Sequence, residues 1–139
     1  MLCEHLAGTY DVWAADHRTL RSLIVGDHDL APTTENLWLR AGAAEPWEYD
    51  VILMDTSDTT WTFKRDARIS RPLDDILWSR DGIEYLRPEV QLLHKARAVR
   101  RKDLADFEAC LPRLGAQERQ WLARALGIAH PGHPWIARL

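Results

Sequence analysis

The fold class is decided where strands give way to helices, in the stretch IEYLRPEVQLLHKA at residues 83–96. Its first four residues indicate a short strand. Pro88 then fits the first turn of a helix, and the acidic Glu89 favours the positive end of that helix. The helix is expected to continue through the apolar positions Val90, Leu92, Leu93 and Ala96.

Upstream of this stretch, the sequence predicts short strands separated by turns. Strands are expected where β-branched and aromatic side chains gather, at residues 9–14, 36–40, 47–54 and 59–64. The small residues 42–44 allow the second and third of these strands to pair as a hairpin. Residues 2–7 indicate the last turns of a helix that ends at Gly8, residues 18–25 fit no single pattern, and residues 26–29 indicate a polar loop.

Downstream, apolar side chains recur every three to four residues, which predicts helices over residues 102–111 and 117–126. The tail at residues 130–135 is rich in Pro and Gly, and we expect Trp135 and Ile136 to dock on the core. Strands followed by helices are typical of an α+β fold. The sequence therefore predicts one domain over residues 1–139, with a strand-rich front at 1–86 and a helical part at 87–139.

Composition is that of an ordinary globular protein, with 139 residues, 46% hydrophobic and 28% charged side chains. The sequence shows no transmembrane run and no secretion leader, so we expect a cytoplasmic protein without a membrane partner. Cys3 and Cys110 are far apart in sequence and are expected to be reduced thiols. The net charge of −3 argues against a nucleic-acid partner, so most of the seven Trp residues are expected in the core.

Charge is distributed unevenly along the chain. Residues 1–86 hold 8 Lys/Arg and 16 Asp/Glu, a net charge of −8, whereas residues 87–139 hold 10 and 5, a net charge of +5. An acidic front beside a basic rear is compatible with a cleft in which carboxylates hold a metal and basic groups hold phosphates. Solvated surfaces are the more common reason for such a distribution.

Two carboxylates, Glu48 and Asp50, stand two positions apart on the strand predicted over residues 47–54. Side chains two apart on a strand project to the same face, so the pair can share a metal or position a hydroxyl group. The alternative interpretation is that both simply point outwards from a half-buried strand.

Basic residues gather where two predicted helices meet, at Lys95, Arg97, Arg100, Arg101 and Lys102. Lys binds a polyphosphate as a point charge and Arg grips it through two parallel hydrogen bonds, so this cluster is a candidate for the phosphates of a nucleoside triphosphate. The alternative is a solvated junction in which these cations pair with nearby acids such as Asp103 and Asp106. The sequence carries no Gly-rich P-loop.

Four segments in this order resemble the aminoglycoside 2''-adenylyltransferase-like family of nucleotidyltransferases, namely residues 83–96, 101–107, 111–114 and 130–135. The resemblance extends to residues 13–16, 37–40 and 47–53. It implies a mixed β-sheet flanked by helices, with Mg²⁺ and a nucleoside triphosphate beside three acidic residues, and a small-molecule acceptor. Asp50 would be the third of these acids, catalytic and metal-binding. The triphosphate would face Lys95, Arg101 and Lys102, while Glu48, Asp103 and Asp106 would line the cleft edge.

The family places a Gly-Gly pair at a helix start and an Asp-x-Asp motif on the next strand, ahead of the residues that match 2–8. Neither motif precedes those residues in this chain. Three hypotheses follow: a truncated enzyme that is inactive alone, a module that binds a nucleotide or another small molecule, and an active enzyme whose start codon is misplaced. Loss of front strands would also expose a sheet edge and apolar residues such as Val12 and Leu37, which predicts either a homodimer through that edge or a poorly soluble protein.

Overall fold

A computed structural model of the chain describes residues 2–16, 19–24, 30–57 and 59–139. The chain divides into two compact units, Met1–Met54 and Asp55–Leu139, called here the N-terminal and C-terminal units. Helices and antiparallel sheets are both present and the long helices come last, so the predicted α+β class is confirmed. The boundary between the two units follows residue 54. The sequence had predicted a single domain in which strands give way to helices after residue 86.

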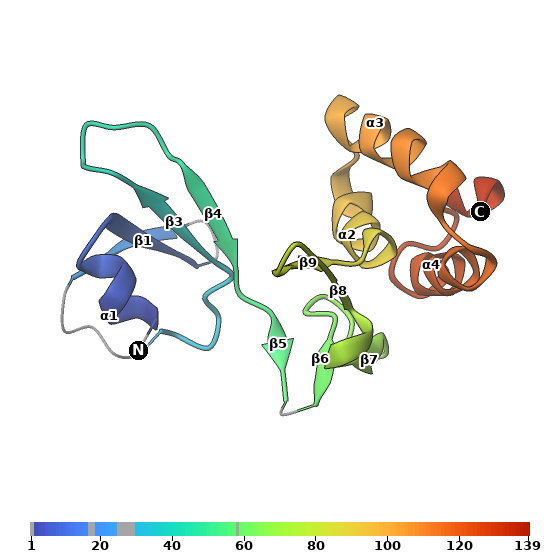
Figure 1. The fold of residues 1–139 in the computed structure, drawn as a ribbon, viewed down its shortest axis with the longest axis horizontal. Coiled ribbons are helices and arrows are strands. Elements are labelled where there is room, and N and C mark those ends of the chain that lie inside the picture. Colours follow the sequence, from blue (N-terminus) through green and yellow to red (C-terminus); the bar gives the residue numbers. More distant parts are fainter. Residues whose placement is uncertain (1, 17–18, 25–29, 58) are drawn as a thin grey trace. The chain divides into compact units, whose positions relative to one another are not determined.

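The N-terminal unit holds a four-stranded antiparallel sheet in the order β2-β1-β3-β4, preceded by the short helix α1 (Leu2–Ala7) (Figure 1). The strands are β1 (Asp11–Asp16), β2 (Thr19–Leu23), β3 (Asn36–Arg40) and β4 (Tyr49–Ile52). The predicted hairpin of β3 and β4 is confirmed, with Trp38 opposite Asp50. The sequence missed β2 because its residues are exposed except for Leu23, so burial imposes no alternation on them.

The core of the N-terminal unit lies on one face of this sheet. Val12 and Leu37 are fully buried, and they join Ala14, Leu23 and Leu39 in one apolar cluster. Leu6 and Ala7 of α1 pack against this cluster. The expectation that Val12 and Leu37 lose their cover is therefore wrong, because the unit supplies its own helix and loops to bury them. The predicted loop at residues 26–29 lies outside the described residues.

The opposite face of the sheet carries three tryptophans around one arginine. Trp47 packs edge-on against Trp13 and Trp38, with ring centroids 6.4 and 5.6 Å away. The Arg40 guanidinium lies 4.4 Å from the centroid of Trp47 and is paired with Asp11 at 2.6 Å. Cation–π contact and the ion pair together hold this aromatic face in place.

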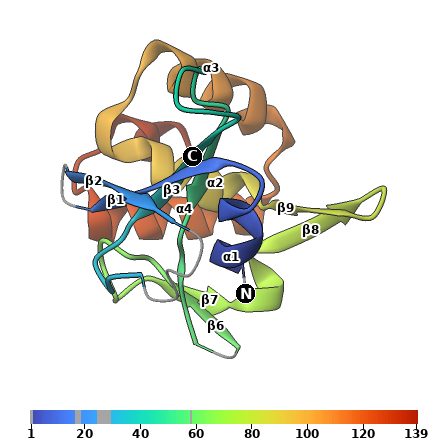
Figure 2. The ribbon, with the colours of Figure 1, turned by 90° about the vertical axis from the view of Figure 1, so that its left-hand side faces the viewer.

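The C-terminal unit begins with two small antiparallel sheets. The first is formed by β5 (Asp55–Thr56), β6 (Thr60–Thr62) and β7 (Ser70–Pro72), and the short 3₁₀ helix η1 (Leu73–Asp75) follows it. The second is the hairpin of β8 (Leu77–Arg80) and β9 (Ile83–Leu86), which extends away from the helices of this unit (Figure 2). Its turn residues Asp81 and Gly82 have φ values of 54° and 76°, as a tight two-residue hairpin turn requires.

Every strand pair among the described residues is antiparallel, and the strands form three separate sheets. The resemblance implied one mixed sheet. The difference follows from the connections, because strands joined by short turns pair in antiparallel fashion, whereas parallel pairs need a crossover of a dozen or more residues.

Three helices complete the C-terminal unit and confirm the helices predicted from the sequence (Figure 1). They are α2 (Pro88–Lys95), α3 (Arg101–Cys110) and α4 (Ala116–Ala129), separated by the 3₁₀ turns η2 (Ala96–Ala98) and η3 (Leu111–Arg113). Their apolar faces meet in a core where Leu93, Phe107 and Leu122 are fully buried. No helix among the described residues combines the length and the apolar character needed to cross a membrane.

The C-terminal tail docks on this core as the sequence predicted. Residues Pro134–Arg138 form the 3₁₀ helix η4, and Trp135 is 3% exposed. Its ring stacks on Phe107 with centroids 4.3 Å apart and an interplanar angle of 6°. The His133 ring nitrogen Nδ1 accepts a hydrogen bond from the Trp135 amide at 3.2 Å and so caps the start of η4.

One titratable residue, His94 on α2, is packed among aromatic rings in the C-terminal unit. The Phe63 and Trp61 ring centroids lie 5.2 and 6.0 Å from that of His94, and the His94 Nε2 is buried without a hydrogen-bond partner among the described residues. The pKa of His94 is lowered from 6.5 to about 4, mainly by burial and in smaller part by the nearby Arg65 guanidinium.

We expect stability to fall as the pH drops from about 6.5 to about 4, by about 3 kcal/mol in total. In this window the unfolded chain binds a proton at His94 and the folded chain does not, so protonation favours unfolding. Urea unfolding at several pH values, compared with His94→Phe, isolates this contribution because the carboxylates are common to both proteins. Parallel pH dependences of the two proteins would contradict the buried, neutral His94.

Candidate functional site

Asp50 and Glu48, the predicted acidic pair, belong to the N-terminal unit. Asp50 lies on β4 beside the aromatic face, is exposed, and its Oδ1 accepts a hydrogen bond of 2.5 Å from Asn36 Nδ2. Glu48 is exposed just before β4, where its amide donates to the Leu39 carbonyl. Both residues are thus exposed to solvent, in agreement with the simpler of the two interpretations, although only Asp50 belongs to the strand.

The Mg²⁺ implied by the family resemblance needs more ligands than this pair supplies. Within the described part of the chain, no three His, Cys, Asp or Glu side chains gather into a group that could hold a metal. The sequence has one Asp-x-Asp triplet, Asp27-His28-Asp29, which lies outside the described residues. The described residues do not fit a magnesium site.

The predicted basic cluster lies at the junction between α2 and α3, where acidic side chains hold part of it. Lys95, the last residue of α2, places its Nζ 2.6 Å from Asp106 Oδ2 and 3.5 Å from Asp103 Oδ1. The hydrogen bond to Asp106 is the main cause that raises the pKa of Lys95, so the ammonium group stays charged. Three of the predicted residues thus form one ion-pair network.

Asp103 has a second role at the start of α3. Its carboxylate accepts hydrogen bonds from the Arg100 amide at 3.0 Å and from the Arg100 guanidinium at 2.7 and 3.2 Å. These hydrogen bonds hold the pKa of Asp103 well below its usual range. Its side chain is 1% exposed, so Asp103 caps the helix and anchors Lys95 from inside. Asp106, by contrast, lies at the surface of the network, with 49% of its side chain exposed.

Arg101 and Lys102 occupy the first turn of α3 and are exposed. Neither forms a hydrogen bond through its side chain or an ion pair with any residue in the described part of the chain. The junction therefore combines a lysine held by two carboxylates with two cationic side chains that remain open to solvent. We call the set Lys95, Arg101, Lys102, Asp103 and Asp106 the junction site.

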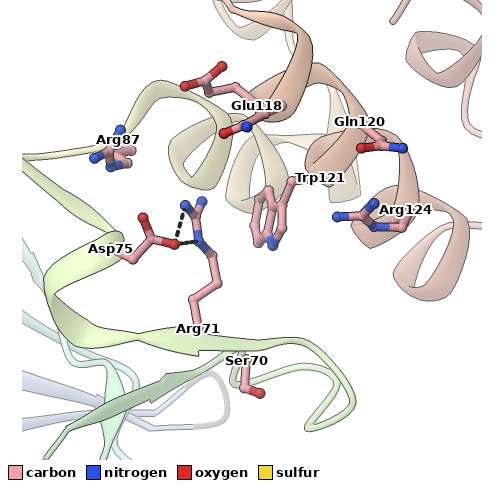
Figure 3. Close-up of a pocket in the computed structure, with 9 residues that line it drawn as sticks. Ser70, Arg71, Asp75, Arg87, Glu118, Gln120, Trp121 and Arg124 are labelled. Carbon is pink, nitrogen blue, oxygen red and sulfur yellow. Dashed lines mark hydrogen bonds and ion pairs between the residues drawn. The ribbon is translucent and has the colours of Figure 1, made fainter.

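A pocket in the C-terminal unit was missed by the sequence analysis. It has a volume of about 540 Å³ and lies between β7, η1, the start of α2 and α4. Figure 3 shows Arg71 rising from β7 towards Trp121 on α4, with Asp75 beside it. The remaining charged side chains that line this α4 pocket are Arg87, Glu118 and Arg124. Sequence spacing gives no signal for it, because Arg71 and Trp121 are 50 positions apart.

Comparisons of the chain with protein-family models, with curated proteins and with solved structures found no match.

Proposed function

We propose that the chain is a nucleotidyltransferase-like protein related to aminoglycoside adenylyltransferases, which binds the phosphates of a nucleoside triphosphate at the junction site and transfers no nucleotide by itself. The observation that carries the proposal is the arrangement at the junction. One protonated lysine is fixed by Asp103 and Asp106, and the exposed Arg101 and Lys102 in the first turn of α3 have no side-chain partner within the described part of the chain. The family resemblance of residues 83–96 and 101–107 supports the same assignment.

Phosphate oxygens at this site would find donors of two kinds. Arg101 offers a planar fork for bidentate hydrogen bonds and Lys102 a mobile point charge. Lys95 becomes available only where a phosphate competes with Asp106, since the buried Asp103 keeps the lysine in place from the other side. Asp106 is therefore the residue that limits affinity in this proposal.

The proposal of binding without catalysis rests on the acidic residues. Asp50, the third acid that the family resemblance implies, is hydrogen-bonded to Asn36 and has no partner carboxylates for a metal among the described residues. The sequence also lacks any Gly-Gly pair.

We propose a cytoplasmic location as well, in keeping with the free thiol of Cys110.

We expect ATP to bind in calorimetric titration at low salt, and the affinity to fall by about threefold to tenfold in the double variant Arg101→Gln, Lys102→Gln. The affinity should also fall as ionic strength rises, because exposed charges are screened. A matched control is Arg80→Gln, Arg113→Gln, which removes two exposed charges outside the junction site.

Three outcomes would overturn the proposal. The first is no binding at millimolar ATP, and the second is an equal loss of affinity in both double variants. The third concerns catalysis: an adenylylated aminoglycoside formed by the purified chain with ATP and Mg²⁺ would refute binding without transfer.

A further inference from the structure

The α4 pocket contains one arginine whose charge is fully balanced. The Arg71 guanidinium donates to Asp75 at 3.0 and 2.7 Å and to the buried Glu89 at 2.9 Å. It also lies 4.8 Å from the centroid of the Trp121 ring. Arg71 is thus a fixed part of the wall, and it holds Trp121 in position.

Two further arginines of the pocket are not balanced in this way. The guanidinium groups of Arg87 and Arg124 form no hydrogen bond or ion pair with any of the residues that the structure describes. The Arg87 Nε is buried and lacks an acceptor there, while the Arg87 amide is anchored to the Ile76 carbonyl at 2.8 Å. Two carboxylates line the pocket, Asp75 and Glu118, and Asp75 is committed to Arg71.

The two unbalanced arginines are separated by the aromatic wall. Figure 3 shows Arg87 and Arg124 on opposite sides of the pair formed by Arg71 and Trp121. A ligand that uses both arginines must therefore carry an anionic group at each end. Between these ends the exposed part of the Trp121 ring offers a flat apolar surface.

We propose that the α4 pocket binds a small aromatic ligand that carries a carboxylate or phosphate group at each of its two ends. Arg87 and Arg124 each hold one oxyanion, and the ring of the ligand packs against Trp121. The site shares no residue with the junction site, so it does not depend on the proposed binding of a nucleoside triphosphate.

Calorimetric titration of the full chain with two probes tests this inference. Terephthalate has a carboxylate at each end of a benzene ring, and 4-carboxyphenyl phosphate replaces one carboxylate by a phosphate. Benzoate, with one acidic group, serves as the reference. At least one of the two-ended probes is expected to bind about tenfold more tightly than benzoate, since a hydrogen-bonded charge pair contributes on this scale.

The variants Arg87→Gln and Arg124→Gln should each lower the affinity for the two-ended probe about tenfold, to the level of benzoate. Neither side chain has a partner in the described part of the chain, so both variants are expected to fold normally. Arg113→Gln, an exposed arginine outside the pocket, is the matched control and should leave the affinity unchanged. Failure of both probes to bind at millimolar concentration, or equal affinities in all variants, would overturn the inference.

Discussion

Replacement of Arg71 by Met is expected to destabilise the C-terminal unit by about 3–5 kcal/mol, because the buried Glu89 then loses its counter-charge. The Glu89 side chain is 1% exposed and its Oε1 lies 2.9 Å from Arg71 Nη1. An uncompensated buried carboxylate must either stay charged in an apolar setting or take up a proton, and both cost free energy. Asp75 also loses its partner, but half of its side chain is exposed to water.

Urea unfolding followed by helical circular dichroism measures this effect, since the three long helices all belong to the C-terminal unit. The double variant Arg71→Met, Glu89→Met is the control. Replacing both partners of a buried pair by apolar residues is often neutral or stabilising, so most of the lost stability should return. If the single variant is as stable as the wild type, the pair has no part in holding the unit together.

Trp135→Ala is expected to destabilise the same unit by about 3–5 kcal/mol, the range for truncation of a large buried aromatic side chain. The ring is 3% exposed and stacks on Phe107, which is itself fully buried. Its removal leaves a cavity between η4 and α3 and detaches the tail from the core. Trp135→Phe keeps a ring in contact with Phe107, so the loss should be smaller.

The midpoint of thermal unfolding measures independently how much each contact of the tail contributes to stability. Arg138 at the end of η4 pairs with Glu108 on α3 at 2.5 and 2.9 Å, and both side chains are about half exposed. Glu108→Gln breaks this pair without touching the stacked rings and should change stability by less than about 1 kcal/mol. Equal effects of Glu108→Gln and Trp135→Ala would show that the aromatic contact does not dominate the docking of the tail.

Helices were predicted well from the sequence because their buried residues are apolar and recur at a regular spacing. On α4, Leu122, Ala125 and Leu126 are buried at the spacing of three and four residues that marks one helical face. Pro88 marked the start of α2 because it fits the first turn of a helix. Exposed strands show no such regular pattern of apolar residues. β2 and most of β8 lie at the surface, so no alternation of burial indicated them.

Ion pairs between side chains that are far apart in the sequence could not be predicted from the sequence. It assigned Glu89 to the helix start alone, whereas the structure buries Glu89 and pairs it with Arg71, 18 positions away. Lys95 and Asp106 were placed at one junction because only one short turn separates their helices. The alternative interpretation, in which junction cations pair with Asp103 and Asp106, holds for Lys95 and Arg100 and, among the described residues, does not extend to Arg101 or Lys102.

The affinity of Asp106→Asn for ATP tests the central claim most directly. Asn has nearly the same shape as Asp, so the variant removes one negative charge from Lys95 while Asp103 stays in contact with that lysine. If phosphates bind at the junction site, the loss of this competing charge should tighten ATP binding by about fivefold. An affinity that is unchanged or weaker would show that Lys95, Asp103 and Asp106 serve only to fasten α2 to α3, and the proposed phosphate site would be refuted.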